Sequence, residues 1–166
     1  MAIARKAAGL MLSLPLAVGA ATVAMAACPQ ELAVYRGTDG IGDLEFTGGG
    51  AGMHSEMRLL YPGVEPVTIY LSHDDRLDRA IAMLPLNCPE GDVTGEELAA
   101  CLVYQGPVYK IDRESGVAGL PGTGTDAAES LLLPGLASAL WDNPQFDGAG
   151  PTERPAEVFE ISGCQE

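Results

Sequence analysis

Short runs in which apolar and polar residues alternate recur along the chain beyond residue 30. Leu44 and Phe46 fall on one face of such a run, and Met57, Leu59 and Tyr61 fall on one face of the next. Further runs rich in β-branched or aromatic residues lie at 32–36, 67–71, 102–104, 108–111 and 158–161. Alternation bounded by Gly and Pro is typical of half-buried β-strands. We therefore predict a mainly β fold, a β-sandwich or a small barrel-like domain, with an α+β fold as the alternative.

Glycine and proline residues separate these runs. The chain contains 21 Gly and 12 Pro, which favours many turns over long helices. The turn sequence Gln105-Gly106-Pro107 lies between two of the runs and predicts a β-hairpin. The glycine run 48–52 and the Gly-, Thr- and Ala-rich segment 116–128 are predicted to be surface loops.

Two short helices complete the predicted elements. Thr94 followed by Glu97 fits a capping box, so a helix of one or two turns is expected to continue to Cys101. The second candidate spans 134–141, with Pro134 in its first turn. The run 77–84 has helical spacing of its apolar residues but ends early at a proline, and it stays ambiguous between helix and strand.

The first 26 residues have the pattern of a secretory signal peptide. Arg5 and Lys6 precede a stretch from Ala7 to Ala27 without any charge, and Ala24-Met25-Ala26 supplies the small residues of a cleavage site. We predict export, a signal peptide at 1–26 and a single domain at 27–166, located in the periplasm or secreted. Two alternatives stay open: an uncleaved membrane anchor, and a lipoprotein lipidated at Cys28.

All four cysteines lie beyond the predicted cleavage site. An even number of cysteines in an oxidising compartment predicts two disulfides. We expect Cys88–Cys101, which closes a short turn-rich loop, and Cys28–Cys164, which ties the ends of the domain together. Lipidation of Cys28 would leave one of the other three thiols without a partner, and for the cleaved protein it would be the one reason to expect contact with a membrane.

The chain is strongly acidic. It has 166 residues, with 9 Lys and Arg against 23 Asp and Glu, and a formal net charge of −14. This balance argues against a protein that binds nucleic acid, because affinity for the phosphate backbone comes from basic side chains. A basic protein or peptide is the partner that the charge favours, although acidity also serves solubility.

His73 is the candidate for chemistry, because Asp74, Asp75 and Asp78 follow it closely. A carboxylate beside an imidazole can orient it as a base or complete a metal site, and His54 could add a second nitrogen ligand. The plainer interpretation is a polar turn after a strand. Neither histidine lies in a zinc-binding pattern, and we predict no catalytic residue, no metal ligand and no cofactor.

Three further patterns have plainer explanations. Asp39, Asp43 and Glu45 could together bind calcium, but they do not follow an EF-hand spacing and are expected to form a solvated acidic loop. Residues 120–124 match the L-P-x-T-G sorting signal, yet no hydrophobic tail follows them, so we expect a turn. The glycine run 48–52 lacks the residues of a phosphate-binding loop.

These features together predict a small, acidic, exported bacterial protein that binds or interacts within the cell envelope rather than catalysing a reaction. The bacterial origin is favoured by the small number of lysines relative to arginines and by the pattern of the predicted signal peptide. Two alternatives stay open: an inhibitor of a basic secreted enzyme, and an exported metal-dependent hydrolase that uses His73 and a nearby aspartate.

Overall fold

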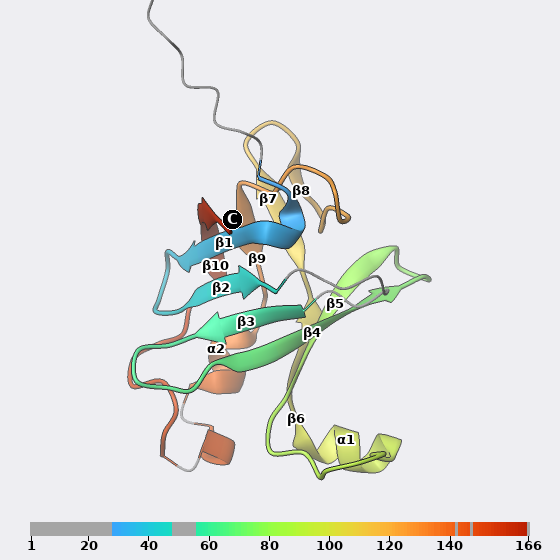
Figure 1. Cartoon of the computed structure of the whole chain (residues 1–166), viewed down its shortest axis with the longest axis vertical. Helices are drawn as coiled ribbons and strands as arrows, with labels where there is room; N and C mark the ends of the chain where they lie inside the picture. The colour runs from blue at the N-terminus through green and yellow to red at the C-terminus, as the bar shows by residue number, and fades with distance from the viewer. Residues whose placement is uncertain (1–27, 48–55, 142, 147, 166) are drawn as a thin grey trace, which may run out of the picture.

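The computed structural model of the chain describes residues 28–47, 56–141, 143–146 and 148–165. In these ranges, ten strands form one antiparallel sheet that curls into a half-barrel, accompanied by two short α-helices (Figure 1). The predicted mainly β, barrel-like class with two short helices and two disulfides is therefore confirmed. The predicted signal peptide at 1–26 and the glycine run 48–52 lie outside the described residues.

One part of the sheet is a meander in which each strand pairs with the next along the chain. It comprises β1 (Ala33–Gly37), β2 (Asp43–Phe46), β3 (Glu56–Leu60), β4 (Val67–Asp74), β5 (Arg79–Pro85) and β6 (Leu102–Pro107). Alternate side chains are buried, as in β4, where Val67, Ile69 and Leu71 face the core. The period of two therefore sets which face of each strand packs inward.

In the other part of the sheet, called the crossed group below, the strands do not lie in their order along the chain. It contains β7 (Tyr109–Asp112), β8 (Gly116–Gly119), β9 (Ser130–Leu132) and β10 (Val158–Cys164), arranged as β10-β9-β7-β8. Strand β10 pairs with β1, and this pairing joins the two parts. The Cys28–Cys164 disulfide lies at the end of that pair, with the two Cα atoms 5.7 Å apart. Both predicted disulfides are present.

The predicted hairpin around Gln105-Gly106-Pro107 is wrong. Strand β6 pairs with β5, β7 pairs with β8 and β9, and only Val108 separates β6 from β7. The glycine serves packing here, because any side chain at Gly106 would collide with the ring and hydroxyl of Tyr104. The chain therefore stays nearly extended and carries the meander across to the second part of the sheet (Figure 1).

The loop predicted at 116–128 is also corrected at its start, since residues 116–119 form strand β8. This strand has weak β propensity by sequence, and it forms because β7 offers it a full register of backbone partners from Tyr109 to Asp112. The ambiguous run 77–84 belongs mostly to strand β5, which pairs with β4 and β6. Backbone pairing across the sheet thus determines that both segments form strands.

Both helices lie within their predicted ranges, but Pro134 precedes the second helix, whose N-cap is Gly135, and does not stand in its first turn. Helix α1 (Gly95–Cys101) starts at Thr94, whose side chain accepts from the Glu97 backbone N–H while the Glu97 carboxylate accepts from Thr94. It stands at the far end of β6, away from the middle of the sheet, and the Cys88–Cys101 disulfide closes its loop (Figure 1). Helix α2 (Leu136–Leu140) buries Leu136 and Leu140 in the core.

No helix in the described part of the chain is both long and apolar enough to cross a membrane. The two disulfides are consistent with an exported protein, since such bonds persist in oxidising compartments.

Two buried tyrosines of the core have opposite surroundings. The Tyr35 hydroxyl lies 3.1 Å from the Ala128 carbonyl oxygen and 3.0 Å from the Gln30 amide nitrogen, and burial raises the pKa of Tyr35 to about 12. The Tyr61 hydroxyl is buried too, but within the described residues it has no hydrogen-bond partner. The Tyr61 ring covers Gly42, where a side chain would collide with it.

Removing the hydroxyls should separate these two cases. We expect Tyr35→Phe to lower the free energy of unfolding by about 1–2 kcal/mol, because it breaks a buried hydrogen-bond network. Tyr61→Phe should leave stability unchanged or raise it, because it removes an unpartnered buried polar group. Urea unfolding of both variants beside the wild type measures the difference, and an equal loss in both would contradict it.

The two disulfides should contribute unequally. Replacing Cys28 and Cys164 together by Ser releases a loop with a sequence separation of 136, whereas Cys88 and Cys101 close one of 13. Chain entropy predicts losses of about 5 and 3 kcal/mol respectively. Urea unfolding of the two double-serine variants is the measurement, and a larger loss for the short loop would overturn the expectation.

Candidate functional site

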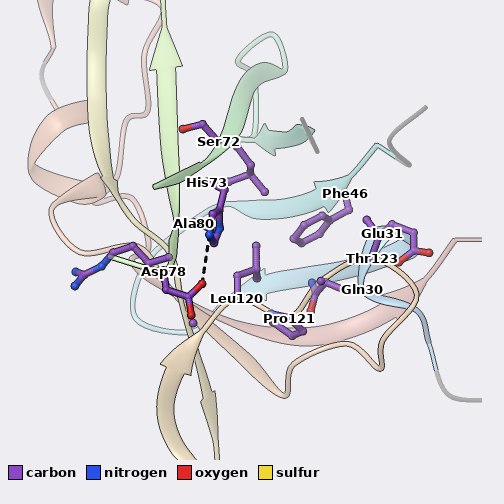
Figure 2. A pocket seen from close by; sticks show the side chains of 14 residues that line it. Gln30, Glu31, Phe46, Ser72, His73, Asp78, Ala80, Leu120, Pro121 and Thr123 are labelled. Atoms are coloured by element: carbon purple, nitrogen blue, oxygen red, sulfur yellow. Dashed lines mark ion pairs between the residues drawn. The ribbon is translucent and has the colours of Figure 1, made fainter. Parts of the chain in front are cut away.

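A cleft of about 410 Å³ opens beside the β4–β5 hairpin (Figure 2). Its floor includes Phe46 and Leu71, which are both almost fully buried. Its polar rim and far wall are formed by Gln30, Glu31, His73, Asp78, Leu120, Pro121 and Thr123. The cleft therefore combines an apolar floor with titratable groups at its rim.

His73 reaches the cleft because of its place in β4. Val67, Ile69 and Leu71 alternate along the core-facing side of this strand, and His73 is the next residue on that side. It lies beyond the packed core and is about half exposed. Its Nε2 atom is 3.3 Å from Oδ1 of Asp78, as the dashed line in Figure 2 shows.

The other acids near His73 have different roles. Asp74 accepts hydrogen bonds from the backbone N–H groups of Arg76 and Leu77, at 2.9 and 3.3 Å, so it shapes the turn between β4 and β5. Asp75 is 3.9 Å from His73. Asp78 ends the turn with φ of 47°, a left-handed conformation that aspartate tolerates. The predicted polar turn is thus present, and Asp78 is its closest acid to the imidazole.

The opposite wall depends on the residues just before β1. Gln30 is buried, and its Oε1 accepts from the Ala128 N–H at 2.9 Å. Glu31 accepts at 2.8 Å from the N–H of Gly124, and this hydrogen bond lowers the pKa of the Glu31 carboxyl. The Thr125 carbonyl accepts from the Gln30 N–H at 2.9 Å, which ties the segment after the wall to Gln30.

The segment that matches L-P-x-T-G forms this wall. Leu120 and Pro121 face the cleft (Figure 2), and the Thr125 hydroxyl donates at 2.6 Å to the carbonyl of Gly122. The turn expected at this segment is therefore present. Glu31 and Gln30 hold it beside the floor of the cleft.

The rim of the cleft has acidic character. Glu31 and Asp78 contribute carboxylates, and neither forms an ion pair with a lysine or arginine of the described chain. Arg79 also borders the cleft, but its Nη1 donates at 3.0 Å to the Tyr109 hydroxyl and its guanidinium lies 6.0 Å from the centre of that ring. A cationic group entering the cleft therefore meets carboxylates at the rim.

The surroundings of His73 were considered for nucleophilic and for metal chemistry. Ser72 and His73 are neighbours on one strand and point to opposite faces. No group of three His, Cys, Asp or Glu side chains in this part of the chain could hold a metal ion. His54, the other predicted ligand, lies outside the described residues.

The acids considered for calcium each lie beside an arginine. Asp39 lies 3.6 Å from Arg154 and accepts hydrogen bonds from the backbone of β10, whereas Asp43 pairs with Arg36 at 3.7 Å. Glu45 pairs with Arg58 across β2 and β3 at 3.0 Å. Each carboxylate is thus matched with its own arginine.

These pairs belong to a wider pattern. Five of the seven cations in the described residues lie within 4 Å of a carboxylate, namely Arg36, Arg58, Lys110, Arg113 and Arg154. The loop closed by Cys88–Cys101 holds Glu90, Asp92 and Glu96, all exposed, and no Lys or Arg occurs between positions 80 and 109. Most of the surplus carboxylates therefore have no basic side chain to neutralise them.

Comparison with protein-family models, with curated proteins and with solved structures finds no match for this chain. Sequence reasoning singled out His73 and Asp78 but missed Gln30, Glu31 and Phe46. The alternation of β4 continues to His73 and could have placed it on the core-facing side. No local pattern marks the other three.

The Glu31 contact should make the cleft wall sensitive to acid. Because the pKa of folded Glu31 lies below its ordinary value of 4.5, the hydrogen bond to Gly124 stabilises the fold at neutral pH. That contribution is lost as pH falls below 4.5 through the lowered pKa. We expect the Gly124 amide resonance to titrate with a midpoint below 4.5 in the wild type, and not in Glu31→Gln. A wild-type midpoint above 4.5 would contradict this.

Proposed function

We propose that this protein is an exported, non-catalytic binding domain of the bacterial cell envelope whose partner is a basic protein or peptide. The observation that carries the proposal is how its charged side chains are paired. The few cations of the described residues are mostly engaged in ion pairs, whereas the carboxylates at the cleft rim and on the Cys88–Cys101 loop form no ion pair with a lysine or arginine of these residues. Such a surface attracts a cationic partner and speeds its association.

Export is supported by the sequence before residue 27 and by the two disulfides. Cys28 is bonded to Cys164, which favours a protein released into the periplasm or the medium over a lipoprotein anchored at Cys28. A thiol already used in a disulfide is not free to carry a lipid.

An inhibitor of a basic secreted enzyme is a second candidate. The feature that favours it is the Cys88–Cys101 loop, which is held by a disulfide and a capped helix and carries the exposed Glu90, Asp92 and Glu96. Its helix α1 stands away from the middle of the sheet (Figure 1). A constrained acidic loop loses little conformational freedom when it binds a basic surface. The hydrolase alternative has no comparable support, because no metal-binding group gathers around His73 in the described residues.

Binding of a short lysine-rich peptide tests the proposal. We expect the protein to bind a fluorescent lysine-rich peptide at 50 mM salt, and the affinity to fall by about tenfold at 300 mM, because salt screens the attraction. Fluorescence anisotropy at both salt concentrations measures this. A glutamate-rich peptide of the same length is the control and should not bind.

Failure to bind the lysine-rich peptide at 50 mM salt would overturn the proposal. Equal binding of both peptides would do so as well, because it would show association without charge preference.

A further inference from the structure

We infer that the cleft beside the β4–β5 hairpin is the recognition site, and that it takes a short segment in which a basic residue adjoins a large apolar residue. This inference rests on the proposed function and names the chemistry at one place on the surface. It depends on the juxtaposition of the Phe46 and Leu71 floor with the Glu31 and Asp78 rim (Figure 2).

The floor supplies a place for an apolar side chain. Phe46 and Leu71 belong to the core yet border the cleft, and Leu120 and Pro121 face them from the opposite wall. An apolar group that enters is removed from water on both sides, which is the main source of affinity in concave sites.

The rim supplies the charge preference. Glu31 has a lowered pKa through its hydrogen bond to Gly124, so it is ionised at neutral pH. Asp78 lies on the other side of the cleft, beside His73. The nearest guanidinium, that of Arg79, is engaged with Tyr109. Exposed carboxylates add modest affinity but favour a cation over a neutral or anionic group.

The size of the cleft limits its occupant. A volume of about 410 Å³ falls at the low end of the range for ligand pockets, roughly 300–1,000 Å³. It admits one large side chain together with its neighbour, and it is too small for a folded surface. The occupant is therefore an extended or flexible segment of the basic partner.

Two substitutions remove the rim charges with little change of shape. Glu31→Gln retains an oxygen that accepts from the Gly124 N–H, and Asp78→Asn keeps a residue that tolerates the left-handed backbone at this position. The matched control is Glu114→Gln with Glu153→Gln, which changes the net charge equally at two exposed positions that do not line the cleft.

Two blocked tripeptides of equal charge serve as probes. One contains lysine, phenylalanine and lysine, and the other has glycine in the middle. We expect the phenylalanine peptide to bind the full domain about tenfold more tightly, because only its ring gains from the apolar floor. The rim double variant should weaken this binding by about fivefold, and the control double variant by less than about twofold.

Gly122→Trp provides an independent check. A Cβ atom at Gly122 would meet no other atom within 4 Å, and Gly122 lines the cleft, so the variant is expected to fold and to place its indole over the cleft. It should abolish the preference for the phenylalanine peptide while leaving the binding of a longer lysine-rich peptide. Amide chemical shifts of the wild type should change at Ser72, His73 and Thr123 on titration.

The outcomes separate this inference from the proposed function. Equal affinity for the two tripeptides, or equal weakening by the rim and control variants, would overturn the cleft as the recognition site while lysine-rich peptides still bind. Absence of binding to any lysine-containing peptide would overturn both.

Discussion

The pairing of β1 with β10 is the constraint on which the rest of the structure depends. The meander β1–β6 and the crossed group β7–β10 share one backbone ladder, from Ala33 opposite Cys164 to Gly37 opposite Phe159. The Cys28–Cys164 disulfide fixes one end of that ladder, and Asp39 accepts from the backbone N–H groups of Glu157 and Val158 at the other. Without this junction, the sheet would divide into two parts linked through Val108.

The shape of the cleft depends on the same β1–β10 pairing. Phe46, His73 and Asp78 belong to the meander, whereas Leu120 follows β8 in the crossed group. The distance between these walls is set by the β1–β10 ladder and by the hydrogen bonds that Glu31 and its neighbour Gln30 make to residues 124–128. A binding site built across two parts of a sheet is only as rigid as their connection. The terminal disulfide therefore serves the site as well as the stability of the fold.

Local sequence patterns predicted those elements whose structure is determined by residues close together in the chain. Alternating and β-branched runs located the strands of the meander other than β5, whose run stayed ambiguous. The Thr94–Glu97 capping box located α1, and the number and positions of the cysteines predicted both disulfides. The false hairpin at Gly106-Pro107 arose because glycine also allows close packing, here against Tyr104. Strand β8 was missed because its backbone partners, rather than its own propensity, make it a strand. The cleft depends on residues more than 80 positions apart, which no local pattern records.

Insertion of β10 between β1 and β9 has a consequence for how the molecule is assembled. This central strand is made from residues 158–164, so the sheet cannot be completed until almost the whole described chain has been synthesised. Before that moment, β1 and β9 each present an unsatisfied backbone edge, and such edges invite pairing with other chains. A nascent molecule is thus at its most vulnerable to aggregation just before its last strand arrives. Thiol oxidation between Cys28 and Cys164 would then make that final step hard to reverse.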